Sequence, residues 1–198
     1  MKKTFYMNTF NPIVKLMFLL GFSAVLTILV KFLHIEMSEI AALPANVPSI
    51  FNQFMTDLNL FNLILFLFLV VLIGANMAWF ITQDSLLNYV KSDHQSFKLR
   101  HFLRQRERTE QTAEREHLTS FNPINAAFNR TMSKAVIHVM KDEILVYIKI
   151  PKTQQAQKIL KEMENQIKTE ISSQNPDYIF SGFERQKHQL WLKGTRKF

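Results

Sequence analysis

Two long apolar runs dominate the first half of the chain. No residue from 58 to 83 carries a charge, and a helix of this length crosses a hydrocarbon core of about 30 Å. The earlier run, 12–35, has lysines only near its two ends, where long side chains can reach the interface. A cleaved signal peptide is the alternative for this run, but its apolar part is long and the bulky residues that follow form a poor cleavage site. We predict two transmembrane helices, at about residues 12–35 and 58–81.

In the last third of the chain, apolar and polar residues alternate over short stretches, as they do in the strands and helices of a soluble domain. Two runs rich in β-branched residues and two shorter apolar runs predict four strands, at Lys134–Met140, Glu143–Ile150, Tyr178–Glu184 and His188–Lys193. Pro151 ends the second strand, and apolar residues recur every three or four positions between Thr153 and Ile171. The order ββαββ indicates an antiparallel sheet with one helix. The predicted fold class is therefore a membrane α-helical hairpin plus a small cytoplasmic α+β domain.

A charged segment joins these two parts. It begins with a loosely helical pattern of apolar residues that includes Leu86, Leu87, Val90 and Phe97, and it then becomes strongly charged. A turn signal follows at Asn122-Pro123. We therefore divide the chain into a transmembrane hairpin (1–83), a basic helical stalk and linker (84–132) and a ββαββ domain (133–198).

The distribution of positive charge predicts how the protein is oriented. The net charge is +8, yet the segment from Glu36 to Asp57 between the two apolar runs contains no Lys or Arg. Loops that remain in the cytoplasm carry the excess of positive residues. We expect a two-pass plasma-membrane protein with both termini in the cytoplasm.

The densest basic stretch is "FKLRHFLRQRER", which follows the second apolar run. Its cations are Lys98, Arg100, Arg104, Arg106 and Arg108. Orientation in the membrane is a sufficient reason for them, and contact with anionic head groups would contribute about 1 kcal/mol per cation. The stretch is therefore interpreted as a membrane-surface site, with contact to nucleic-acid phosphates as the less favoured alternative.

The second apolar run also contains a candidate packing surface. Asn62, Leu69 and Asn76 fall at intervals of seven, so they share nearly one face of a helix, and Gly74 with Ala78 forms a small-xxx-small pair nearby. These residues predict helix packing, either within the hairpin or between copies of the chain.

No motif points to catalysis. The four glycines are too scattered for a phosphate-binding loop or a dinucleotide fingerprint, and the six histidines have no metal-ligand spacing. The chain contains no cysteine. We predict no catalytic residue, no metal and no cofactor, and hence no enzyme.

The layout resembles the membrane-anchoring front part of FtsK/SpoIIIE-type DNA translocases of Gram-positive conjugative elements. The similar segments are the two spans with their short loop, the basic stretch, "KAVIHVMKDEILVYIKIP", "TQQAQKILKEMENQI" and "YIFSGFERQKHQLWLKG". The ATPase of that family has no counterpart in this sequence, so its phosphate-binding residues carry over to no position here. The resemblance implies a component of a DNA-transfer assembly that works with a separate ATPase.

Three functional hypotheses follow. The favoured one is a non-catalytic membrane-anchored component or adaptor of a DNA-transfer or secretion complex, whose partners are the lipid bilayer, other complex proteins and further copies of itself. The second is a membrane-tethered nucleic-acid-binding protein. The third is a small membrane regulator of the immunity or phage-exclusion type.

Overall fold

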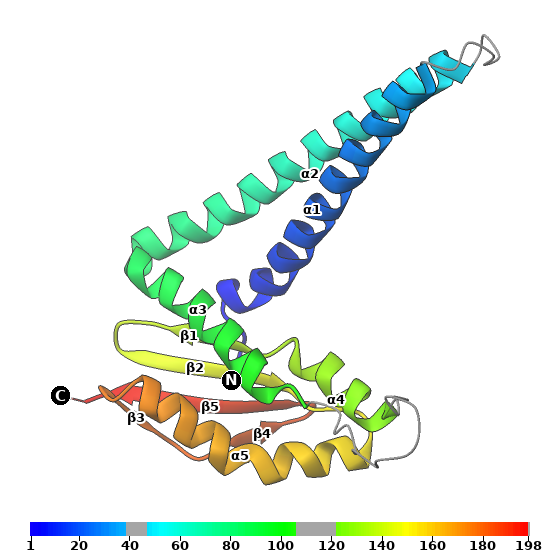
Figure 1. The fold of residues 1–198 in the computed structure, drawn as a ribbon. Coiled ribbons are helices and arrows are strands. Elements are labelled where there is room, and N and C mark those ends of the chain that lie inside the picture. The colour runs from blue at the N-terminus through cyan, green and yellow to red at the C-terminus, as the bar shows by residue number, and fades with distance from the viewer. Residues whose placement is uncertain (39–46, 106–121, 198) are drawn as a thin grey trace, which may run out of the picture. The chain divides into compact units, whose positions relative to one another are not determined.

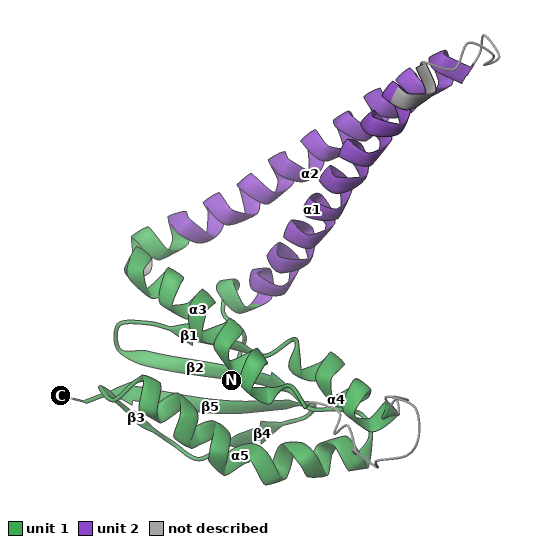
Figure 2. Ribbon diagram, viewed as in Figure 1, with its two compact units in different colours: residues 1–7, 79–198 green, residues 8–78 purple. Residues whose placement is uncertain are grey.

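The computed structural model describes residues 1–38, 47–105 and 122–197 (Figure 1). Contacts group the chain into two compact units, residues 8–78 and residues 1–7 with 79–198 (Figure 2). This grouping differs from the expected division into 1–83, 84–132 and 133–198. The N-terminal residues and the described parts of the expected stalk belong with the sheet, because they pack against it.

The unit formed by residues 8–78 is a pair of long antiparallel helices from α1 (Phe5–Ser38) and α2 (Val47–Gln83). Their antiparallel course is fixed by a hydrogen bond from Thr9 Oγ1 to Asn76 Oδ1 (2.8 Å) and by stacking of His34 on Phe51. Buried and half-buried side chains recur at steps of three and four on both helices. This hairpin seam comprises Ile13, Leu16, Leu20, Ser23, Thr27, Val30 and His34 on α1, and Phe51, Met55, Leu58, Asn62, Leu65, Leu69, Leu72 and Asn76 on α2. A repeat of 3.5 residues is typical of coiled-coil packing.

The outer faces of these helices are apolar and exposed. Phe18 and Phe22 are 76% and 70% exposed, and Val71 on α2 is 65% exposed. Both helices are long and apolar enough to cross a membrane, and only 22% and 6% of their most apolar windows are buried. The core helix of a soluble domain would be mostly buried, whereas these two helices are largely exposed. Each of them contains the predicted apolar run and extends beyond it.

The second unit contains an antiparallel sheet of five strands. The strands are β1 (Val136–Val139), β2 (Glu143–Lys149), β3 (Tyr178–Phe180), β4 (Glu184–Gln186) and β5 (Gln189–Arg196). Their order is β1-β2-β5-β3, and β4 also pairs with β5. Three helices accompany them: α3 (Leu86–Leu103), α4 (Pro123–Met132) and α5 (Gln154–Gln174). The antiparallel α+β prediction is confirmed at this level.

The predicted order ββαββ needs one change, because the expected third strand is broken in two. Phe180 lies opposite Gly194, whereas Glu184 lies opposite Trp191, so the register on β5 shifts by one residue between β3 and β4. One extra residue in one of two paired strands is a β-bulge. The break occurs at Ser181-Gly182, where the backbone N–H of Ser181 still donates to Lys193 O.

Both faces of the sheet are in contact with other parts of the unit. On one face, apolar residues of all the longer strands pack with α4 and α5 in a single core. A Cβ atom at Gly194 would lie 2.6 Å from the ring of Phe180, so the glycine makes room for this packing. On the other face, Lys3 Nζ lies 3.8 Å from the centre of the Tyr147 ring, and the amine of Met1 bonds Gln186 Oε1. The N-terminal residues are thus part of the α+β domain.

Helix α3 protects the edge strand β1. Ser92 Oγ accepts from Val139 N (2.9 Å) and Ser96 Oγ accepts from Ile137 N (2.9 Å). The Ser96 hydroxyl donates to Ile137 O (3.1 Å), whereas the Ser92 hydroxyl donates to Asn88 O (2.6 Å) in its own helix. Four helical residues rise about 6 Å and two strand residues span nearly the same length, so hydroxyls at i and i+4 match alternate strand residues. The outward N–H groups of Ile137 and Val139 are therefore unavailable for pairing with another chain.

Candidate functional site

The α+β domain has an open groove between α5 and the β4–β5 hairpin. Its volume is about 530 Å³, and its floor is formed by Ile150, Leu160, Leu190 and Phe183. Pro151 ends β2 and lets the chain turn into α5, and Gln157 Nε2 bonds the carbonyl of Pro151 (3.0 Å) to hold this corner. We call this feature the binding groove. Its lining is Ile150, Gln154, Gln157, Lys158, Leu160, Lys161, Glu164, Phe183, Arg185 and Leu190.

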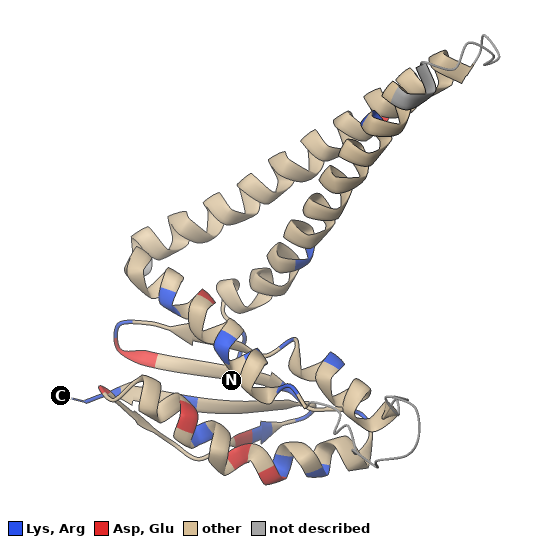
Figure 3. Cartoon of the chain, in the orientation of Figure 1, with Lys and Arg blue, Asp and Glu red and all other residues tan. Residues whose placement is uncertain are grey.

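The rim of the binding groove is positively charged. Lys158 and Lys161 come from α5 and Arg185 comes from β4, whereas Glu164 is the one acidic lining residue. The ion pairs found among the described residues, Lys98–Glu170 and Lys193–Glu143, involve none of these cations. Figure 3 shows Lys and Arg residues on both α5 and β4. Exposed cations above an apolar floor can bind a segment that combines carboxylates with an apolar side chain.

The predicted basic stretch is only partly a free surface. Lys98 Nζ lies 3.7 Å from Glu170 Oε1, and Arg100 Nε donates to the carbonyl of Ala135 (2.8 Å) at the edge of β1. Burial lowers the pKa of Arg100 to about 10, so its guanidinium stays charged at neutral pH. Arg104 is exposed just after α3, while Arg106 and Arg108 lie outside the described residues. The role of this stretch at a membrane surface or on phosphates stays a prediction.

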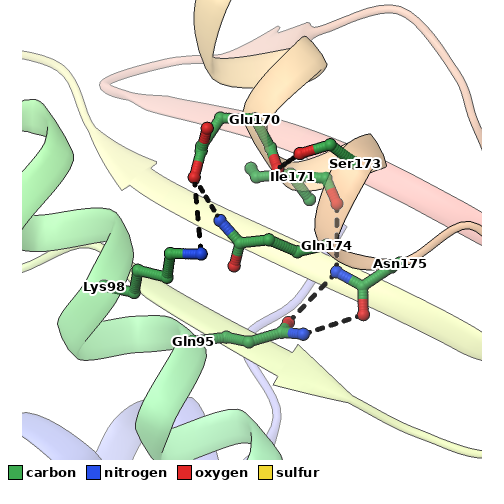
Figure 4. A network of polar contacts seen from close by, with 7 residues as sticks. All are labelled: Gln95, Lys98, Glu170, Ile171, Ser173, Gln174 and Asn175. Carbon is green, nitrogen blue, oxygen red and sulfur yellow. Dashed lines mark hydrogen bonds and ion pairs between the residues drawn. The ribbon is translucent and has the colours of Figure 1, made fainter.

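The network that ties α3 to the end of α5 gave no signal in the sequence (Figure 4). Gln95 Nε2 donates to Asn175 Oδ1 (2.8 Å), Asn175 Nδ2 donates back to Gln95 Oε1 (3.2 Å), and both residues are buried. Asn175 Nδ2 also bonds Ile171 O at the last turn of α5. Buried amides cost free energy unless they are paired, so this reciprocal pair fixes the register of α3 against α5.

The residues predicted to pack helices fall on two different surfaces of α2. Asn62, Leu69 and Asn76 belong to the hairpin seam, where Asn62 Nδ2 donates to Thr27 Oγ1 (2.9 Å) and Asn76 is fully buried. Gly74 and Ala78 are exposed, and a Cβ atom at Gly74 would have no atom within 4 Å. Asn62, Leu69 and Asn76 thus pack within the hairpin, whereas Gly74 and Ala78 face outward.

His138 lies in a fully buried aromatic pocket on β1. Its Nδ1 is 2.9 Å from Thr4 Oγ1, and the rings of Tyr6 and Phe80 lie 5.1 Å and 5.3 Å from the imidazole. Nε2 has no hydrogen-bond partner among the described residues. The sequence predicted a strand at this position, but it did not indicate that His138 would bond the N-terminal residues. Burial lowers the pKa of His138 to about 4, so it is neutral and unsuited to proton transfer near neutral pH.

We expect acid to destabilise the domain through His138. Its folded-state pKa of about 4 is below the usual 6.5, so the unfolded state binds the proton first as pH falls from 6.5 to 4. This group therefore removes roughly 3 kcal/mol of stability across that window. Burial raises the pKa of Asp93, so its protonation stabilises the folded state as pH falls, opposite to the effect of His138. The pH dependence of a His138 variant must therefore be compared with that of the wild type. Urea unfolding of the full chain in detergent should show a shallower pH dependence for His138→Phe than for the wild type, and equal pH dependences would contradict this expectation.

No group of three or more metal-ligating side chains occurs among the described residues. No family model matches the chain, and comparisons with curated proteins and with solved structures gave no match.

Proposed function

We propose that the protein is a non-catalytic membrane adaptor, anchored in the plasma membrane by α1 and α2, whose cytoplasmic α+β domain binds an acidic segment of a partner protein. The observation that carries the proposal is the binding groove, in which three cations surround a floor of buried apolar side chains. The apolar outer faces of α1 and α2 support the anchor.

The contacts of the N-terminal residues support a two-pass arrangement. Thr4 bonds His138 and Lys3 lies over Tyr147, so Met1–Met7 and the sheet belong to the same side of any membrane. Two crossings return the chain to the side on which it began. The charge distribution favours the cytoplasmic side, because the loop between the helices lacks Lys and Arg.

The setting that we propose is a DNA-transfer or secretion complex, because the layout resembles the membrane-anchoring part of DNA translocases. The partner would then be another membrane-complex protein, such as a separate ATPase. A nucleic-acid-binding role is less favoured, since Lys98 and Arg100 already serve contacts inside the domain. An inhibitory membrane regulator would use the same groove on a different target.

The groove is tested with peptides selected from a random library on the full chain in nanodiscs. We expect enriched peptides to combine Asp or Glu with Leu, Ile or Phe. Changing Lys158, Lys161 and Arg185 together to Glu should weaken the binding of such a fluorescent peptide about 100-fold, on the order of 1 kcal/mol per reversed charge.

A control with the same change in net charge separates the groove from general electrostatics. It reverses three exposed cations outside the groove, Arg130, Lys141 and Lys197. This variant should bind the peptide nearly as well as the wild type. Equal losses in both variants, or enrichment of peptides without acidic residues, would contradict the proposed site. Groove-dependent binding of a DNA oligonucleotide alone would favour the nucleic-acid hypothesis.

A further inference from the structure

Helix α3 has one apolar face that packs in the core of the domain and a second group of apolar side chains that are partly or largely exposed. Leu99 and Leu103 are buried in the core, beside Ser92 and Ser96 at the edge of β1. Four apolar residues point elsewhere: Leu86 is 40% exposed, Leu87 80%, Val90 63% and Phe97 49%. At about 100° per residue these four fall in one sector, on the side of the helix away from Ser96, together with the exposed His94 and His101.

Cations adjoin this apolar sector. Lys91 is exposed one turn after Leu87, and Lys98, which pairs with Glu170, lies two turns further on the same side with its side chain 50% exposed. Arg104 follows directly after the helix. An apolar stripe bordered by lysine and arginine is typical of helices that lie in the head-group region of a bilayer. Each such cation contributes about 1 kcal/mol at an anionic surface.

The chain itself delivers α3 to the membrane surface. Only Asp84 and Ser85 separate the end of α2 from the start of α3. Within the α+β unit this turn is held by three hydrogen bonds: Asp84 N donates to Phe80 O (2.7 Å), Asp84 Oδ1 accepts from Asn88 Nδ2 and Asp84 Oδ2 accepts from Lys141 N. A helix that begins two residues after a membrane span starts within reach of the lipid head groups.

From these observations we infer that the outer face of α3 lies in the membrane interface, with Leu87, Val90 and Phe97 among the outer parts of the acyl chains and Lys91 at the head groups. This inference rests on the proposed membrane anchor. It makes the domain a surface-bound body, held at the bilayer by α3 as well as by the two spanning helices. The alternatives are that this face of α3 contacts a second copy of the chain or another protein instead of lipid.

Single cysteines can measure this placement, because the natural chain contains none. The full chain is reconstituted in vesicles of phosphatidylcholine and phosphatidylglycerol with an environment-sensitive fluorophore at Val90→Cys or Phe97→Cys. Spin-labelled lipids should quench both probes to about half the extent seen at Leu67→Cys in α2, because interfacial helices lie only about 5–10 Å deep. A probe at the exposed Ser173→Cys on α5 should remain unquenched.

The probe at Leu67 tests the membrane anchor separately from the placement of α3 in the membrane interface. If it is quenched while Val90 and Phe97 are not, the anchor holds and the interfacial placement of α3 is wrong. If Leu67 is also unquenched, the membrane proposal itself fails. Emission at Val90 that shifts with protein concentration, without lipid quenching, would assign the face to a second copy and would equally overturn the inference.

Discussion

Replacing Ser92 and Ser96 together with alanine is expected to lower the free energy of unfolding of the α+β domain by about 3–6 kcal/mol. Each hydroxyl accepts from the N–H of a buried residue of β1, Val139 for Ser92 and Ile137 for Ser96, and the Ser96 hydroxyl also donates to Ile137 O. Removing both hydroxyls leaves these backbone groups unsatisfied away from water, at a cost of about 1–3 kcal/mol for each group that finds no new partner. Such a loss is a large part of the typical stability of a domain.

Thermal unfolding of the full chain, followed by tryptophan fluorescence, measures the effect, because Trp191 is fully buried in the sheet. Hydrogen exchange at Ile137 and Val139 should accelerate in the double variant. Ser133→Ala is the matched control, since its exposed hydroxyl only bonds Arg130 O at the end of α4, and it should change stability by less than about 0.5 kcal/mol. A double variant as stable as the control would show that α3 does not satisfy the edge of β1.

The elements set by local periodicity were predictable from the sequence. The expected strands Lys134–Met140 and Glu143–Ile150 correspond to β1 and β2, and the apolar spacing after Thr153 corresponds to α5. These patterns repeat over a few residues, so one stretch of chain is enough to reveal them. The two apolar runs likewise correspond to α1 and α2, although both helices extend beyond the predicted spans.

Features that depend on contacts between distant segments were not predictable. The polar residues Ser92, Gln95 and Ser96 gave α3 the character of an exposed stalk, yet they are its buried face, because their partners are strand edges and an amide on α5. Conversely, Leu87 and Val90, which belong to the loosely helical apolar pattern of the predicted stalk, are exposed. Polar side chains can be buried where they form hydrogen bonds with backbone groups, so a polar face of a helix is not always its exposed face.

The candidate site depended on tertiary structure in the same way. Lys158 and Lys161 are ordinary surface positions of a helix, and Arg185 is in β4 at a position between the predicted strands Tyr178–Glu184 and His188–Lys193. They surround one groove only because the bulge after Phe180 and the β4–β5 hairpin bring β4 beside α5. The anchoring of the N-terminal residues on His138 joins positions 134 residues apart, which no local pattern can indicate.

The central claim is that α1 and α2 cross the membrane and leave the N-terminus and the α+β domain together in the cytoplasm. A single cysteine at Ser49, near the start of α2, would then be outside the cell, whereas cysteines at Lys2 and at Ser173 would be inside. All three positions are exposed in the structure, and the cysteine-free chain gives no background. Accessibility should therefore differ in an all-or-none manner.

Labelling with a membrane-impermeant maleimide in intact cells tests this arrangement most directly. The account predicts that Ser49→Cys reacts, and that Lys2→Cys and Ser173→Cys react only after the membrane is permeabilised. Labelling of Ser173→Cys in intact cells, or opposite results at Lys2 and Ser173, would contradict it.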